Sequence, residues 1–162
     1  MCPLPTLIHL KRKYKAYLYV DEAHSIGALG ATGRGIVEHF GCDPRDIDIL
    51  MGTFTKSFAS SGGYIGGSLS LISYLKHTSH AHCYASSMCS IVCTKITNIL
   101  EEFLQLSSNV NNLMLNIRLR LDTLKENTKY FRARLKSLGF CVLGEDESPV
   151  VPCLIRVPSK NM

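Results

Sequence analysis

The 162-residue sequence lacks the features that mark a membrane-spanning, secreted or repetitive protein. No apolar run approaches the roughly 20 residues that a helix needs to cross a bilayer, and no signal peptide is visible. We therefore expect no targeting or transmembrane segment in this chain. Internal repeats and low-complexity segments are missing too. Hydrophobic residues make up 46% of the chain and charged residues 19%, a balance typical of a globular protein with a buried core.

Paired cysteine motifs are also missing. The seven cysteines are odd in number and scattered, with no CxxC spacing. This favours reduced thiols in a cytosol-facing compartment over a disulfide framework. Three histidines and three cysteines lie near one another in the sequence, but their spacing fits no zinc pattern, so we predict no metal site; they are His77, His80, His82, Cys83, Cys89 and Cys93.

A strong excess of one charge is not present either, since the net charge is only +5. Much of it lies in Lys11–Lys13 and in a later helical segment. Such clusters could favour an anionic membrane surface, but a solvated face explains them more simply. We predict no nucleic-acid partner.

What the sequence does contain is a lysine just beyond an apolar segment, in Gly52-Thr53-Phe54-Thr55-Lys56-Ser57-Phe58. The preceding residues Ile47–Met51 alternate and are partly β-branched, which predicts a strand. The small residues Ala59–Gly63 allow a tight turn and a close approach of the backbone to a bound group. A partly desolvated lysine can act as a Schiff-base nucleophile, although by itself this pattern indicates a solvated lysine.

A second cluster lies upstream, in Asp21-Glu22-Ala23-His24. Lys15–Val20 predicts a buried strand, so Asp21 would lie at the carboxyl end of a strand, where open α/β sheets bind ligands. The letters D-E-A-H also spell the metal-binding motif of a helicase family. Such an ATPase needs a GxxxxGK[ST] phosphate loop, and the sequence contains none.

Together, the two clusters meet the needs of a pyridoxal phosphate enzyme. Such an enzyme needs a lysine that holds the cofactor covalently and a carboxylate beside the pyridine nitrogen. It also needs hydroxyls or amides for the phosphate. Lys56, Asp21 and the pair Thr53 and Thr55 match these three needs, and the combination is far more specific than either motif.

The rest of the chain predicts a mixture of loops, helices and strands. The first ten residues, with two prolines, predict a loop. The segment 113–124 fits either a strand or a helix, and the helix-forming residues after it favour a helix. The other predicted elements are helices at Ile36–Phe40, Leu69–Lys76, Ile91–Leu106 and Asn127–Leu138, and strands at Gly63–Gly67, Phe140–Leu143 and Val150–Val157.

Several longer motifs carry a resemblance to a known family. They are Tyr14–Ala28, the Gly33-Arg34-Gly35 turn, Gly52–Phe58, Ser61–Gly67, Tyr84–Ser87, Asn127–Arg132 and Ser148–Pro152. Together they resemble the lysine-bearing long-chain-base subunits of serine palmitoyltransferases, in the α-oxoamine synthase family of pyridoxal phosphate enzymes.

The resemblance covers nearly the whole chain and implies an α/β fold. Residues 1–110 would form the second half of the cofactor-binding large domain, a mainly parallel sheet with flanking helices. Residues 111–162 would form a connecting helix and the start of a small C-terminal α+β domain.

The resemblance also implies a role for each site residue. Lys56 would bind pyridoxal phosphate covalently and shuttle protons. Asp21 would pair with the pyridine nitrogen, and His24 would donate a hydrogen bond to the phenolic oxygen of the cofactor. The phosphate would be contacted by Thr53 and Thr55, and that of a facing subunit by Ser86 or Ser87.

The reaction implied is the condensation of L-serine with palmitoyl-CoA to 3-ketodihydrosphingosine in sphingolipid biosynthesis. The implied partner is a lysine-lacking serine palmitoyltransferase subunit, in a heterodimer at the cytosolic face of the endoplasmic reticulum membrane, with membrane association through segments absent here. Two alternatives stay open: a truncated, non-catalytic remnant that docks onto a partner subunit, or another α-oxoamine synthase.

The chain departs from the family pattern in two ways. Relatives carry a glycine where this chain has Ala59, and a side chain there is unfavourable if the backbone needs a positive φ. The upstream part of the large domain and the rest of the small domain are also missing from the sequence. We therefore expect this chain alone to be inactive.

Overall fold

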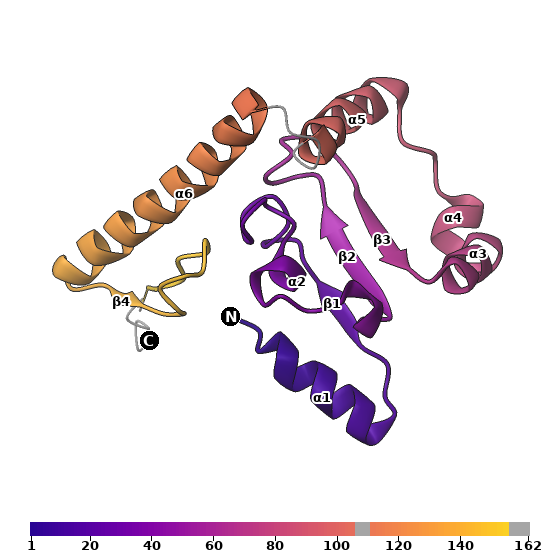
Figure 1. Cartoon of the computed structure of the whole chain (residues 1–162), viewed down its shortest axis with the longest axis horizontal. Coiled ribbons are helices and arrows are strands. Elements are labelled where there is room, and N and C mark those ends of the chain that lie inside the picture. The colour runs from indigo at the N-terminus through magenta and orange to yellow at the C-terminus, as the bar shows by residue number, and fades with distance from the viewer. Residues whose placement is uncertain (106–110, 156–162) are drawn as a thin grey trace, which may run out of the picture.

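The structure, a computed structural model, describes residues 1–105 and 111–155 (Figure 1). It contains six α-helices, one 3-10 helix and five strands within those residues. In chain order they are α1 (Leu4–Tyr14), β1 (Tyr19–Asp21), α2 (Ile36–His39), η1 (Pro44–Asp46), β2 (Ile49–Thr53), β3 (Gly63–Gly67), α3 (Leu69–Thr78), α4 (His80–Tyr84), α5 (Ser90–Gln105), α6 (Asn111–Ser137), β4 (Cys141–Val142) and β5 (Cys153–Leu154).

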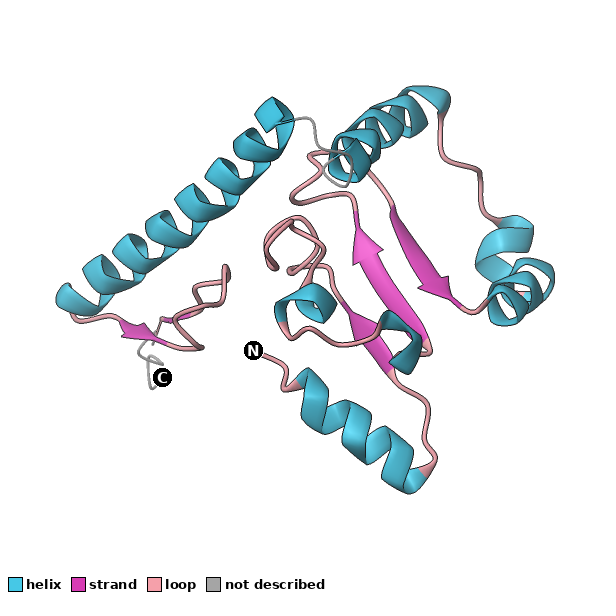
Figure 2. Ribbon diagram, viewed as in Figure 1, coloured by secondary structure: helices cyan, strands magenta, loops and turns pink. Residues whose placement is uncertain are grey.

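A three-stranded sheet in the order β1-β2-β3 lies at the centre of the larger part (Figure 2). Strands β1 and β2 are parallel, with Asp21 opposite Met51. Strands β2 and β3 are antiparallel, with Thr53 opposite Gly63, because the loop that joins them is too short for the crossover that a parallel pair needs. The predicted α/β fold is confirmed, and the described part of its sheet is mixed.

Two clusters of buried side chains hold this part together. The larger one packs α1 and α2 against one face of the sheet; its buried members are Leu4, Ile8, Val20, Ile36, Val37 and Ile47. The smaller one contains Phe54, Phe58 and Ile96, and the two phenylalanine rings pack edge to face at 5.3 Å. Each such side chain contributes about 1.5–3 kcal/mol on burial, so both strand ends that carry the predicted site rest on packed residues.

The prediction of a loop over the first ten residues was wrong, because α1 begins at Leu4. Pro5 lies in the first turn of this helix, where a missing N–H breaks no hydrogen bond. Leu4 and Ile8 are one helical turn apart and both are buried. Burial of this short apolar stripe against the core outweighs the two prolines, and the sequence alone could not reveal that core.

Several other elements differ in length from the prediction. Strand β1 spans only Tyr19–Asp21, whereas the prediction began at Lys15, which ends α1 in a left-handed conformation with φ of 51°. Strand β2 starts at Ile49, two residues after the predicted start, and runs on to Thr53. Strands β4 and β5 contain two residues each. The helix α4 was not predicted.

The ambiguous segment 113–124 is helical, as predicted, and it is continuous with the next predicted helix. Together they form α6, a single helix of 27 residues that runs beside the β4-β5 hairpin, away from the three-stranded sheet (Figure 1). The predicted helices around α2, α3 and α5 are also present. Residue 106 and residues 156–157 of the predicted elements lie outside the described residues.

Two predicted absences concern membranes and metals. Among the described residues, no helix has the length and apolar character needed to span a bilayer. The same residues contain no group of three or more histidine, cysteine or acidic side chains placed to hold a metal ion.

Candidate active site

The carboxyl ends of β1 and β2 bring the two sequence clusters together. Asp21 ends β1 directly beside Met51 of β2. Its Oδ1 accepts a hydrogen bond of 2.8 Å from the backbone N–H of Ala23. The carboxylate therefore holds the turn that carries Ala23 and His24 at the end of the sheet.

The lysine-bearing loop begins where β2 ends. Thr53 Oγ1 donates to the carbonyl of Gly62 at 3.1 Å and accepts from the backbone N–H of Thr55 at 3.2 Å. The hydroxyl oxygens of Thr53 and Thr55 are 2.8 Å apart. The two hydroxyls thus form one polar corner immediately before Lys56.

Ala59 adopts a left-handed backbone conformation, with φ of 45°, so the conformation that the sequence indicated as unfavourable for a side chain is present. Its N–H donates to the carbonyl of Lys56 at 2.8 Å, and its carbonyl accepts from Lys95 Nζ of α5. A non-glycine residue in this region costs about 1–2 kcal/mol. The surrounding contacts keep the loop in this shape despite that cost.

A close contact joins the lysine loop to the loop after β1. Ser57 Oγ donates to the carbonyl of Ile26 at 2.7 Å. Gly27, at φ of 72°, lies so near that a Cβ placed on it would be 2.4 Å from Ser57 Oγ. Only glycine fits this approach, which explains the glycine after the D-E-A-H segment.

Lys56 lines two neighbouring cavities. The larger, of about 800 Å³, is also lined by Ala23, Thr53 and Tyr64, with further residues from α3 and α4. The smaller, of about 120 Å³, is lined by His24, Lys56 and Ser57 and by residues 149–150 near β5. Lys56 therefore lies between the larger cavity and the smaller one, and His24 also lines the smaller one.

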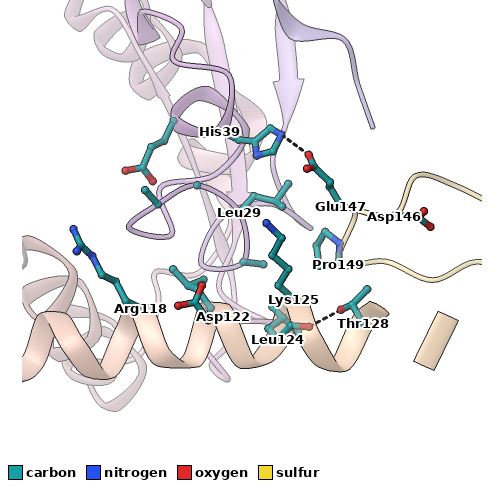
Figure 3. A pocket seen from close by; sticks show the side chains of 15 residues that line it. Leu29, His39, Arg118, Asp122, Leu124, Lys125, Thr128, Asp146, Glu147 and Pro149 are labelled. Carbon is teal, nitrogen blue, oxygen red and sulfur yellow. Dashed lines mark hydrogen bonds and ion pairs between the residues drawn. The ribbon is translucent and has the colours of Figure 1, made fainter. Parts of the chain in front are cut away.

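A third cavity, of about 480 Å³, is not lined by Lys56 but shares Ala28 and Pro149 with the smaller cavity (Figure 3). It lies between residues 28–31, α2 and one side of α6. In Figure 3, Arg118, Asp122 and Lys125 of α6 face this space from one side, and His39 approaches Glu147 on the other. The predicted site residues do not line it.

Glu22 is a structural residue next to the candidate site, to which the sequence prediction gave no role. Its side chain is buried and accepts hydrogen bonds from Ser25 Oγ at 3.0 Å and from the N–H of Ile36 at 2.9 Å. Burial raises the pKa of the Glu22 carboxyl, and these two hydrogen bonds act in the opposite direction. Glu22 ties the loop after β1 to α2; the available signal was an acidic residue between Asp21 and His24 in an apolar setting.

Ser86 and Ser87 lie elsewhere. They are exposed in the segment between α4 and α5 and line neither cavity that contains Lys56. The structure thus places Asp21, His24, Thr53, Thr55 and Lys56 at or just beyond the carboxyl ends of β1 and β2. Lys56 shares the larger cavity with Thr53 and the smaller one with His24, whereas Asp21, Thr55 and the two serines line neither. Their predicted contact with a facing subunit stays a prediction.

Comparison with known protein families identifies the family of this chain. Residues 2–159 match the family described as aminotransferase class I and II. The chain belongs to the aminotransferase class I and II family.

Individual relatives narrow this further. The chain is 50% identical over 157 residues to serine palmitoyltransferase 3 of Mus musculus, covering 97% of this chain and 27% of that protein. It is 47% identical over 160 residues to long chain base biosynthesis protein 2b of Arabidopsis thaliana, covering 99% of this chain and 32% of that protein. The resemblance predicted from the sequence is confirmed. The chain spans between a quarter and a third of the length of these curated relatives.

Solved structures share the fold of this aminotransferase-family chain. A serine palmitoyltransferase of S. paucimobilis, solved as a lysine-to-alanine variant with a bound PLP-myriocin aldimine, matches with a TM-score of 0.80 at 23% identity, covering 98% of this chain and 38% of that one. An 8-amino-7-oxononanoate synthase of Francisella tularensis matches with a TM-score of 0.69 at 21% identity, covering 93% of this chain and 42% of that one. At these identities the likeness shows the fold alone.

Proposed function

We propose that this chain is the cofactor-lysine segment of a serine palmitoyltransferase, a pyridoxal phosphate-dependent acyltransferase. The observation that carries the proposal is the position of Lys56. It follows β2, lines a cavity of about 800 Å³ and shares a second cavity with His24, beside a strand that ends in Asp21. A cavity of that volume is within the usual range for a small-molecule site.

The residues present fit pyridoxal phosphate by the chemistry of their side chains. A primary amine, a carboxylate, an imidazole and two adjacent hydroxyls follow the same ends of the parallel strands β1 and β2, which supports this proposal. Lys56 would hold the cofactor covalently, Asp21 would pair with its pyridine nitrogen and His24 with its phenolic oxygen. Thr53 and Thr55, whose hydroxyls are 2.8 Å apart, would contact the phosphate.

When bound, pyridoxal phosphate supplies an electron sink that stabilises negative charge on the carbon next to a substrate amine. The protein supplies position and proton transfer. Lys56 Nζ would take and return a proton at the substrate carbon, because a flexible amine within one cavity reaches several positions. His24 and Ser57 close the narrow side of Lys56 and would limit the access of water to it.

We also propose the substrates and the partner. L-serine and palmitoyl-CoA would be joined to 3-ketodihydrosphingosine by the full assembly, with a lysine-lacking subunit in a heterodimer at the endoplasmic reticulum membrane. The support is the identity of 43–50% to proteins named serine palmitoyltransferase or long chain base biosynthesis protein.

Labelling with pyridoxal phosphate tests the cofactor site directly. The purified chain is incubated with pyridoxal phosphate, reduced with borohydride and mapped by mass spectrometry. We expect the label on Lys56 at concentrations where other lysines stay unmodified, and its loss in Lys56→Ala. Lys76 is the matched control, because it lines the same larger cavity. Labelling of Lys76 and Lys56 to the same extent would contradict the proposal.

The imidazole is tested separately. His24→Ala should change the absorbance of the bound cofactor while Lys56 stays labelled, because His24 makes no covalent bond in this scheme. An unchanged spectrum would make His24 a packed loop residue without a cofactor role.

A further inference from the structure

Arg132 of α6 is a charged side chain of which only 2% is exposed. Its Nη1 donates to the carbonyl of Leu143 at 2.6 Å and, more weakly, to that of Gly144 at 3.4 Å. Its Nη2 donates to the carbonyl of Val150 at 3.0 Å, and its Nε forms an ion pair of 3.6 Å with Asp146 Oδ1. A buried guanidinium with this many backbone partners fixes the segment that it binds.

The bonded carbonyls lie at the two ends of one turn. Leu143 directly follows β4, and Val150 lies three residues before β5. The guanidinium is a rigid planar fork, so it sets the separation of the two carbonyls as well as donating hydrogen bonds to them. We name residues 143–150, held by Arg132, the clamped turn.

The far side of the clamped turn faces the candidate site. Pro149 and Val150 line the narrow cavity together with His24, Lys56 and Ser57. On its other side Glu147 forms an ion pair of 3.6 Å with His39 of α2. Figure 3 shows Pro149 and Glu147 on this turn, opposite α6.

We propose that Arg132 is a positioning residue for the lysine site. By holding Val150 and Leu143 together, it keeps Pro149 and Val150 in place as one wall of the cavity that contains Lys56. Arg132 lines neither cavity next to Lys56, so it acts through the turn. The identity of the ligand at Lys56 rests on the function proposed above. The positioning of the turn by Arg132 rests only on the contacts of Arg132.

Two measurements on the full chain test the proposal: one tests whether Arg132 holds the turn, and the other tests whether the turn affects Lys56. Amide hydrogen exchange follows the N–H groups of Leu143, Ser148 and Val150, which are bonded within the turn or to Pro152. Pyridoxal phosphate with borohydride gives the concentration for half-maximal labelling of Lys56. The variants are Arg132→Lys and Arg132→Met, and the matched control is Arg134→Met, an exposed arginine on the same helix.

We expect exchange in the turn to become roughly tenfold faster in both Arg132 variants. The concentration for half-maximal labelling should rise about tenfold, since small displacements of a wall cost affinity strongly. Lysine keeps the charge but cannot span both carbonyls, so it should not rescue either effect. The Arg134→Met chain should behave like the unchanged protein.

A double-mutant cycle separates positioning from general stability. Val150→Ala shortens a side chain that lines the narrow cavity and keeps the backbone carbonyl that Arg132 binds. If Arg132 acts through this wall, Arg132→Lys should change Lys56 labelling much less in the Val150→Ala background than in the unchanged chain. Additive effects would overturn the proposal, as would faster exchange with unchanged labelling.

The outcomes also distinguish the clamp from the proposed function. If Lys56 is not labelled even in the unchanged chain, the cofactor proposal fails. The clamp is then decided by amide exchange together with the rate at which a small amine-reactive reagent modifies Lys56. If Arg132→Met does not fold, Arg132→Lys and Val150→Ala provide the same comparison. Equal exchange in Arg132→Lys and Arg134→Met would overturn the clamp.

Discussion

The two walls of the larger cavity beside Lys56 are built differently. One wall comes from β2, β3 and the loops that follow β1 and β2, which rest on the buried clusters around Val20 and Phe58. The other comes from α3 and α4, which supply Ile72, Leu75, Lys76, Ala81 and His82. Neither helix contains a buried residue among those that the structure describes.

The exposed fractions make this contrast plain. Leu4 is fully buried and Val20 is 6% exposed, whereas Leu69 at the start of α3 is 87% exposed and Tyr84 at the end of α4 is 83% exposed. A wall with many packed side chains holds its geometry, and a wall with few can move or repack. Of the residues proposed for chemistry, Thr53 and Lys56 lie on the packed wall, where preorganisation is strongest.

The largest expected effect is on stability. Leu4→Ala should lower the free energy of unfolding by about 2–5 kcal/mol, because it leaves a cavity in the larger cluster. Leu69→Ala, the matched change on α3, should lower it by less than about 0.5 kcal/mol. Urea unfolding followed by circular dichroism measures both. Equal losses would show that α3 is packed as firmly as α1 and would remove the contrast.

A substitution to glycine should have opposite effects on stability in the lysine loop and in α3. Ala59→Gly relieves a left-handed residue of φ 45° and should stabilise the chain by about 0.5–1 kcal/mol. Ser73→Gly, at an exposed position inside α3, should destabilise it by about 0.5–1 kcal/mol. Thermal unfolding of the two variants compares them. A loss of stability in Ala59→Gly would mean that the alanine methyl makes contacts worth more than the strain.

The smallest expected effect is the pH dependence from Glu22 on the packed wall. Burial raises the pKa of this carboxyl in the folded chain above its unfolded value, which is about 4.3. The folded state therefore binds the proton more tightly, so stability is greatest below the unfolded pKa and falls as the pH rises through the folded pKa.

Glu22→Gln removes this titration and should flatten that part of the pH profile. Glu38 is the contrasting carboxyl. Partial burial would raise its pKa, but hydrogen bonds from Thr32 and Arg34 and the Arg34 charge lower it overall. Carbon-13 NMR should place the Glu22 midpoint above that of Glu38, and the reverse order would contradict the assigned burial of Glu22.

Sequence patterns predicted the presence of the main elements better than their ends. The strand before Lys56, the glycine-rich strand after it and the long helices all have strong local periodicity, and each is present. The helix at the N-terminus was missed because its two buried residues, Leu4 and Ile8, make too short a pattern beside two prolines. Strands β4 and β5 are shorter than their apolar runs because strand length depends on the pairing partner.

By itself, the sequence determined which chemistry-bearing residues follow which strand, because strand ends and turns are set by neighbours along the chain. Asp21, His24, Thr53, Thr55 and Lys56 could be found in that way. Only the tertiary structure decided that Glu22 is a buried tie to α2 and that Arg132 holds the clamped turn beside Lys56. Their partners lie 14 and 18 residues away along the chain, and burial at such a separation arises from packing, which no local pattern encodes.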